Sequence, residues 1–181
     1  MGKPDAVVRV LTRGYRVPGE ILDVANRLLP ELAPQLPPAT SVRPGRGSVS
    51  VRSVADLAEA LPAIVAAVLV QPGSVGVIAA DTDAAMLAQA LVAAGVVAAT
   101  MTAADADMAD GFAELSHRVT VLPASLAKGL EYDHVVLVEP AAIVAAEARG
   151  LQRLYVALTR AVTSLTVVHA RPLPQHLLSA A

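Results

Sequence analysis

The chain has 181 residues, enough for one domain with a substantial hydrophobic core, and 55% of them are hydrophobic while only 2% are aromatic. An aliphatic core of this kind suits parallel strands covered by helices. The formal net charge of −2 argues against a domain that grips nucleic acid strongly by itself, and the lack of cysteine excludes disulfides and thiolate metal sites. The four histidines have no metal-ligand spacing.

The first predicted elements are a strand at residues 7–11 and a helix from Pro18 to about Leu29, since proline fits the first turn of a helix. Pro30 is expected to end that helix. Residues 30–47 contain five prolines and two glycines and are expected to form an extended loop. Arg43 and Arg46 within it are interpreted as solvated loop charges.

From residue 48 onward, predicted strands and helices alternate, which indicates an α/β fold with a parallel sheet. Asp81 or Thr82 is expected to cap the helix that reaches Ala94. The expected strands are 48–54, 75–80, 96–100, 118–122, 135–138 and 165–169, and the expected helices are 56–70, 81–94, a weak acidic helix at 103–115, and 142 to about 163.

The apolar run from Met86 to Ala104 has no charge over 19 residues, which approaches the length that spans a membrane. Gly95 within it favours a helix, a glycine turn and a buried strand instead. The sequence shows no signal-peptide pattern. We therefore expect a cytoplasmic protein without membrane contact.

Ligands of parallel sheets bind at the carboxyl ends of the strands, and polar residues gather after the predicted strands at 12–16, 81–83, 125–131 and 139. The sequence contains no phosphate-binding GxxxxGK[ST] loop. Glu139 superficially resembles an acid that holds Mg²⁺, but without that loop we interpret it as the end of a strand. We expect no metal site and no ATP hydrolysis by the chain alone.

Three segments stand out, although each alone fits an ordinary turn, helix start or core helix. They read LTRGYR at residues 11–16, SLAKGLEYD at 125–133 and LYVALTRA at 154–161. In this order they resemble motifs IV, V and VI of UvrD/Rep-type superfamily 1 helicases, in their C-terminal RecA-like domain. The resemblance covers residues 7–170. It implies that residues 1–181 form a single domain with an α/β RecA-like, P-loop NTPase-type three-layer sandwich and a mostly parallel sheet, without the P-loop itself.

The resemblance also implies roles for individual residues in an ATP site shared with an N-terminal RecA-like domain, which would hold ATP with Mg²⁺. Arg16 and Arg160 would reach the γ-phosphate, and Arg160 is expected to project from a helix end toward the partner domain. Tyr15 would stack on adenine. Gly129 and Glu131 would lie beside phosphate and ribose, and Ser125 and Lys128 would face nucleic acid. The parent protein would be an ATP-dependent DNA helicase or translocase.

Departures from the family pattern leave a second interpretation open. Ser125 replaces the family's motif V histidine, and only about 110 residues separate motifs IV and V. This version is most similar to HelD-type helicase-like proteins, which bind and recycle RNA polymerase, and the Arg-rich, Lys-poor composition suits a high-GC bacterium. A degenerate RecA-like domain without a nucleotide role is the third alternative, and it leaves the joint presence of Arg16, Glu131 and Arg160 unexplained.

Overall fold

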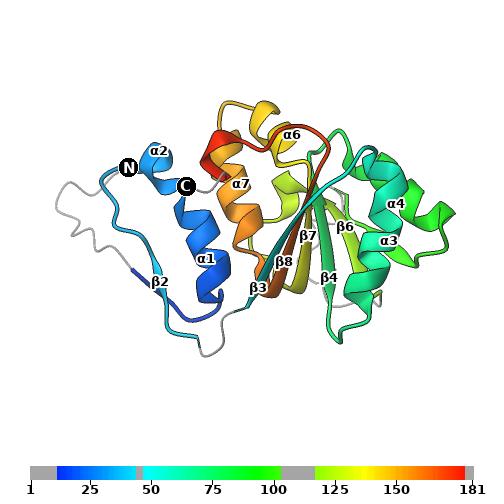
Figure 1. Cartoon of the computed structure of the whole chain (residues 1–181), viewed down its shortest axis with the longest axis horizontal. Coiled ribbons are helices and arrows are strands. Elements are labelled where there is room, and N and C mark those ends of the chain that lie inside the picture. The colour runs from blue at the N-terminus through cyan, green and yellow to red at the C-terminus, as the bar shows by residue number, and fades with distance from the viewer. Residues whose placement is uncertain (1–11, 44–46, 103–116, 178–181) are drawn as a thin grey trace.

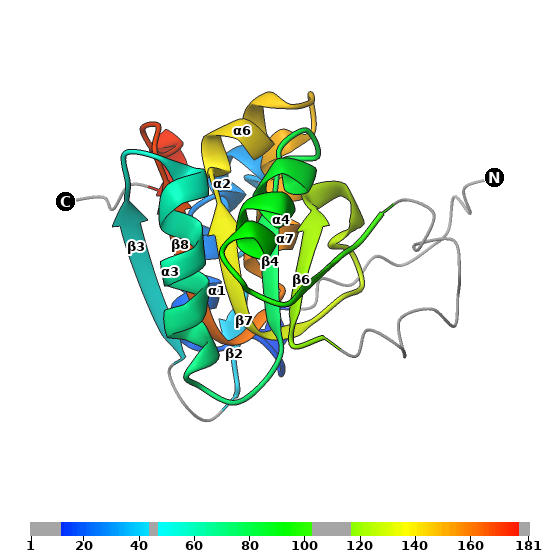
Figure 2. The same cartoon turned by 90° about the vertical axis from the view of Figure 1, so that its right-hand side faces the viewer.

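The computed structural model describes residues 12–43, 47–102 and 117–177. One sheet separates two layers of helices (Figures 1 and 2). The expected strand at 7–11 and the expected helix at 103–115 lie outside the described residues.

Six strands form the sheet in the order β3-β8-β7-β4-β6-β5, and every pair of neighbours is parallel. The predicted α/β fold with a parallel sheet is therefore confirmed. Side chains of a central strand alternate between the two faces: Val135 and Leu137 join one apolar cluster, Val136 and Val138 the other. The strands are β3 (Ser48–Ser53), β4 (Val75–Ala79), β5 (Ala98–Thr100), β6 (Val119–Pro123), β7 (Tyr132–Val138) and β8 (Ala161–His169).

One face of the sheet is covered by α1 (Gly19–Asn26), α6 (Pro140–Ala145) and α7 (Gly150–Leu158), the other by α3 (Leu57–Leu69) and α4 (Ala84–Ala93). The carboxylate of Asp56 caps α3 by accepting a hydrogen bond from Glu59 N at 2.9 Å. Gly95, with φ +81°, turns the chain from α4 toward β5, as expected for this apolar run. No described helix is long and apolar enough to cross a membrane.

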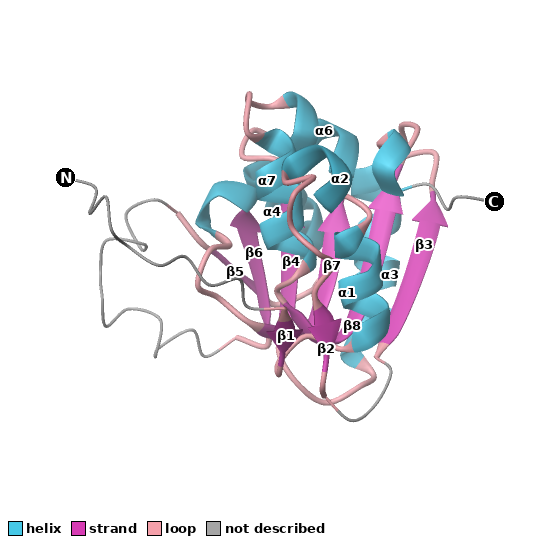
Figure 3. Cartoon of the chain, turned by 90° about the vertical axis from the view of Figure 1, so that its left-hand side faces the viewer, coloured by secondary structure: helices cyan, strands magenta, loops and turns pink. Residues whose placement is uncertain are grey.

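The proline-rich region is more structured than the sequence predicts. The first helix ends at Asn26, and Pro30 lies in the first turn of a second short helix, α2 (Leu29–Leu32), instead of ending the first. Part of the expected loop forms β2 (Thr40–Ser41), which pairs with β1 (Arg13–Gly14) in a separate parallel ribbon. Figure 3 shows this ribbon beside α1, near the edge of the main sheet where its strands begin.

Several other expected boundaries are wrong. The expected long helix at 142–163 is two helices, α6 and α7, and β8 begins at Ala161. Strand β7 begins at Tyr132, three residues before the expected start. Helix α4 begins after Asp83, so neither expected cap holds its start. Asp81 accepts a hydrogen bond from Ser125 N at 3.1 Å, and Thr82 Oγ1 donates to Asp83 Oδ1 at 2.8 Å.

Candidate functional site

The residues singled out from the sequence lie at opposite edges of the sheet. Ser125 follows β6, at the edge where the strands end, which we call the carboxyl edge. Glu131 and Arg160 immediately precede β7 and β8, at the edge where the strands begin, which we call the amino edge. The segment 124–131 therefore connects the two edges. From the sequence, ligand-binding residues are expected at the carboxyl ends of the strands. Ser125 lies there, but Glu131 and Arg160 lie at the amino ends.

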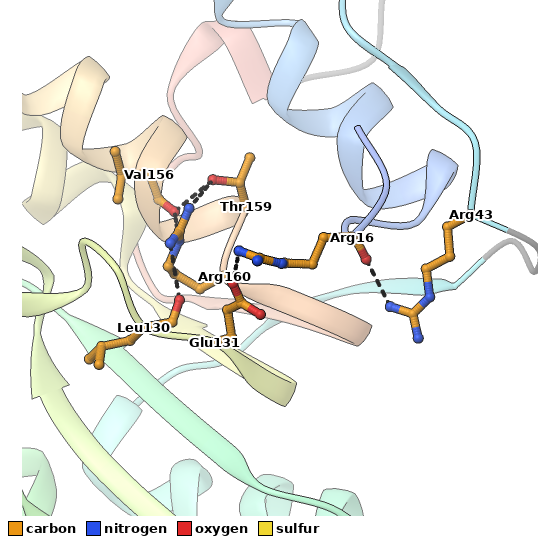
Figure 4. Close-up of polar contacts among 7 residues, drawn as sticks. All are labelled: Arg16, Arg43, Leu130, Glu131, Val156, Thr159 and Arg160. Atoms are coloured by element: carbon orange, nitrogen blue, oxygen red, sulfur yellow. Dashed lines mark hydrogen bonds and ion pairs between the residues drawn. The ribbon is translucent and has the colours of Figure 1, made fainter. Parts of the chain in front are cut away.

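An ion pair joins two of the predicted ATP-site residues across a long separation in sequence. The guanidinium of Arg16 contacts the carboxylate of Glu131, and their side chains are 68% and 35% exposed (Figure 4). Tyr15, beside Arg16, is 76% exposed. An exposed pair of this kind contributes little to stability, so Arg16 is held loosely enough to change partner.

Arg160 is bound by its own domain. Its guanidinium donates hydrogen bonds to Val156 O at 2.9 Å, Leu130 O at 3.0 Å and Thr159 Oγ1 at 3.2 Å (Figure 4). Burial lowers the pKa of Arg160; Glu131 opposes this change and Arg16 adds to it. The side chains of Glu131 and Arg16 therefore lie close enough to Arg160 to affect its pKa.

The expected orientation of Arg160 is wrong. Helix α7 ends at Leu158, so Arg160 lies in the turn before β8 rather than on a helix that continues to 163. Because the side chain is half-buried and folded onto backbone oxygens, it does not project freely from the domain. Arg160 lies next to Glu131, as expected from the grouping of Arg16, Glu131 and Arg160. Its hydrogen bonds to the domain were not expected.

Gly129 has φ +88°, a backbone conformation that side-chain-bearing residues rarely adopt. A Cβ added there would meet nothing within 4 Å, so the backbone angle and not crowding requires glycine. The turn directs the chain toward Leu130, whose carbonyl accepts from Arg160. Gly129 thus shapes the segment that carries Glu131 to the amino edge.

The carboxyl edge holds a second cluster, an open groove of about 370 Å³ that contains both predicted nucleic-acid residues, Ser125 and Lys128. Sequence reasoning did not assign three residues of this groove, although they share one helical turn at the start of α7: Arg149, Gln152 and Arg153. Arg153 pairs with Glu147, and its hydrogen bond lowers the pKa of that carboxyl. The charge of Arg153 is therefore partly neutralised, while Lys128 and Arg149 are exposed.

Several polar groups of the sheet support its structure. Asp133 accepts from Ser74 N and Ser74 Oγ at 2.8 and 2.9 Å, which lowers its pKa. Buried His134 contacts Ser164 Oγ and Pro72 O at 2.7 and 3.0 Å. The carboxylate of Glu139 accepts from backbone amides after β8, in agreement with a strand terminus. Among the described residues, no group of three acidic or histidine side chains could hold a metal.

Comparisons with known proteins agree with this architecture. Residues 119–168 match the UvrD-like helicase C-terminal domain. A solved structure, the C-terminal domain of a possible DNA helicase from Lactobacillus plantarum WCFS1, is similar with a TM-score of 0.63 and 22% sequence identity, over 91% of this chain and 92% of that one. No curated protein sequence matches the chain. The chain thus has the α/β fold of that helicase C-terminal domain, and its residues 119–168 carry the sequence pattern of the UvrD-like helicase C-terminal domain.

Proposed function

We propose that the chain is the C-terminal RecA-like domain of a UvrD-like, ATP-dependent DNA helicase or translocase. In this proposal Arg16 and Arg160 are arginine fingers of an ATP site shared with an N-terminal RecA-like domain. The match over residues 119–168 and the fold support the domain type. The phosphate loop and the Mg²⁺ ligands would come from the N-terminal domain, because this sequence has no such loop. Such a protein would act in the cytoplasm, where DNA lies in bacteria.

The observation that carries the proposal is the convergence of Arg16, Glu131 and Arg160 at the amino edge. Glu131 forms an ion pair with Arg16 and lies near enough to Arg160 to affect its pKa, so one carboxylate faces two guanidinium groups and an excess of positive charge remains. In the transition state of phosphoryl transfer the equatorial oxygens of the γ-phosphate carry negative charge, which a nearby cation stabilises. A planar guanidinium can donate two parallel hydrogen bonds to such oxygens. A phosphate could replace Glu131 as the partner of Arg16, because that pair is exposed.

The remaining assignments fit positions around this cluster. Exposed Tyr15 would offer its ring to adenine, and Glu131, once released from Arg16, would accept from the ribose hydroxyls. Gly129 would let the backbone approach a phosphate because the space beside its Cα is open. Arg160 would have to give up part of its contacts with backbone oxygens when the two domains close. Closure of the domains would then couple hydrolysis to movement along a strand.

The groove at the carboxyl edge is the proposed contact with nucleic acid. Lys128 and Arg149 would bind phosphates, and Ser125 and Gln152 would provide neutral hydrogen-bonding groups. Glu147 and Asp81 lie at the same edge and weaken its positive field. We therefore expect contacts that position a strand and add little affinity by themselves.

A HelD-type module that binds and recycles RNA polymerase is the second candidate. The specific observation in its favour is Ser125, which stands where the family has histidine and whose amide is held by Asp81 at 3.1 Å. A domain of this type would act mainly by contact with protein. Co-purification with RNA polymerase, compared with binding to single-stranded DNA, separates the two candidates.

The test of the ATP-site proposal is hydrolysis by this chain joined to the N-terminal RecA-like domain of its protein. The chain alone should show no turnover. In the joined protein, Arg16→Ala and Arg160→Ala should each lower kcat by about 10³-fold or more, as for other arginine fingers. Arg160→Lys should restore little, because an ammonium cannot form the bidentate fork.

Arg52→Ala is the matched control, since Arg52 is an exposed arginine on the edge strand β3. It should leave kcat unchanged. Normal hydrolysis by both Arg16→Ala and Arg160→Ala would contradict the proposal, as would turnover by the chain alone.

A further inference from the structure

Residues 39–43, which we call the brace segment, bind the backbone on either side of Tyr15 and Arg16. Thr40 N donates to Thr12 O at 2.7 Å and Val42 N to Gly14 O at 2.9 Å, in the short β1-β2 ribbon. Beyond the tyrosine and the arginine, Ser41 Oγ donates to Val17 O at 2.7 Å. The loop that carries Arg16 is thus bound at both ends by one short segment.

The brace segment is itself fixed to the core helix α1. The side-chain amide of Asn26 donates to Ala39 O at 2.8 Å and accepts from Ala39 N at 3.2 Å. Asn26 is the last residue of α1, and the buried face of that helix packs on the sheet. The position of the brace segment therefore follows from the core rather than from the surface loop around it.

Arg43 connects the brace segment to both candidate arginine fingers. Its Nη1 donates to the carbonyl oxygen of Arg16 at 2.8 Å and to the carbonyl oxygen of Val162 (Figure 4 shows the first contact). Val162 lies two residues after Arg160, at the start of β8. The guanidinium of Arg43 thus links the backbone of Arg16 to the backbone that follows Arg160.

These contacts change the interpretation of Arg43 as a solvated loop charge. The side chain is partly buried, and the Nη1 atom is occupied by two carbonyl oxygens of the domain. A residue that bound nucleotide directly would present this group to the ligand. Arg43 instead binds the backbone of Arg16, the residue whose side chain would bind the nucleotide.

We infer that Arg43 is a positioning residue, which holds Arg16 at a fixed distance from Arg160 so that both guanidinium groups can reach the same anion. The inference rests on the proposed ATP site. Its physical reason is that Arg16 has an exposed side chain in a short loop, and that its side-chain partner among the described residues is an exposed carboxylate, Glu131. Without the brace, the backbone of Arg16 would sample several positions, and misplacement of a catalytic group by about 1 Å can cost about 10²-fold in rate.

The kinetic test uses the joined two-domain protein. Arg43→Ala and Arg43→Met should each lower kcat about 10- to 100-fold with little change in KM for ATP. Arg43→Lys should retain more activity, because one ammonium nitrogen can still donate to a carbonyl. Methionine keeps the packing of the stem and lacks donors, so full activity of Arg43→Met would overturn the inference. Arg13→Ala, an exposed arginine of β1, is the control and should behave as wild type.

A second measurement on the chain alone keeps the inference separate from the ATP-site proposal. Backbone amide order parameters of Arg16 and Val17 should fall in Arg43→Met from about 0.85 toward 0.6, while those of α7 stay unchanged. Unchanged order parameters would overturn the inference whatever the kinetics. If Arg16→Ala retains full hydrolysis, Arg16 is not an arginine finger, and the order parameters still decide whether Arg43 positions the loop. If Arg16 is essential and Arg43→Met retains full kcat, the positioning role is wrong.

Discussion

Arg16 and Arg160 are held in different ways, although both belong to the same cluster. Arg16 has an exposed side chain and one carboxylate partner. Arg160 is half-buried and donates to three oxygens of the turn and the neighbouring segment. Leu130 O, one of these acceptors, adjoins Glu131. The two arginines should therefore differ in their contribution to folding even if both serve the same reaction.

Replacement of Arg160 should destabilise the domain, because it removes three hydrogen bonds from partly buried oxygens. We expect Arg160→Ala to lower the free energy of unfolding by about 1 to 3 kcal/mol. Arg16→Ala should lower it by no more than about 1 kcal/mol, as for other exposed ion pairs. Urea denaturation of the chain followed by circular dichroism measures both. A loss for Arg160→Ala that is no larger than the loss for Arg16→Ala would contradict this expectation.

The resemblance of the three segments to helicase motifs was sufficient to group Arg16, Glu131 and Arg160, which the structure brings near one another. It was not sufficient for their contacts. The orientation expected for Arg160 depended on a helix that extended to 163, and the helix ends at Leu158. Arg43 gave no signal, since its acceptors lie 27 and 119 residues away and are backbone oxygens, which any residue provides.

At the level of elements, the break between α6 and α7 is the largest departure from expectation. Apolar residues continue at helical spacing across it, so periodicity alone favours one helix. At this break the backbone of Gly150 packs closely on the backbone of Val144 in α6. A Cβ on Gly150 would collide with the carbonyl oxygen of Val144. Gly150 is the first residue of α7, and it lets the start of this helix lie directly on α6.

Two glycines in equivalent positions test this explanation. Gly150→Ala should destabilise the domain by about 1 to 3 kcal/mol, because the backbone of α6 or α7 must move. Gly19 is the first residue of α1, and a Cβ there would meet nothing within 4 Å. Gly19→Ala should be neutral or stabilise by up to about 1 kcal/mol. Thermal unfolding of both variants gives the comparison, and a loss in Gly19→Ala as large as in Gly150→Ala would contradict it.

For the whole molecule, the alternation of strands and helices predicted the parallel sheet correctly. The apolar runs of β4, β6 and β7 form buried central strands, whereas the edge strand β3 is largely exposed. The short β1-β2 ribbon was not predicted, because strands of two residues have no periodicity. Charge is distributed unevenly: basic side chains lie at both edges of the sheet, while the chain as a whole has a net charge of −2. This distribution suits local contacts with phosphates rather than a strong general attraction to nucleic acid.

The chain alone should bind single-stranded DNA weakly, with Kd of about 1 µM or higher at physiological salt. The reason is that Glu147 and Asp81 offset the basic groups of the groove, and Arg153 is already paired. Fluorescence anisotropy with labelled strands measures the affinity. Lys128→Ala should weaken binding and reduce its salt dependence, whereas Arg52→Ala should change neither. Binding in the nanomolar range would require a contact surface other than this groove.

Strand β3 is hydrogen-bonded only to β8 within the described sheet, and that pairing has a consequence for synthesis. Ser50 and Thr166, which lie opposite each other in this pair, are 116 residues apart. A ribosome that adds about 5 to 20 residues per second needs roughly 6 to 23 s to bridge that separation. During this time the backbone of β3 has no partner strand from the described sheet, and β7, once synthesised, also lacks its β8 neighbour. The nascent chain must therefore remain free of wrong strand pairings until β8 leaves the exit tunnel, which makes β8 the element whose arrival completes the described sheet.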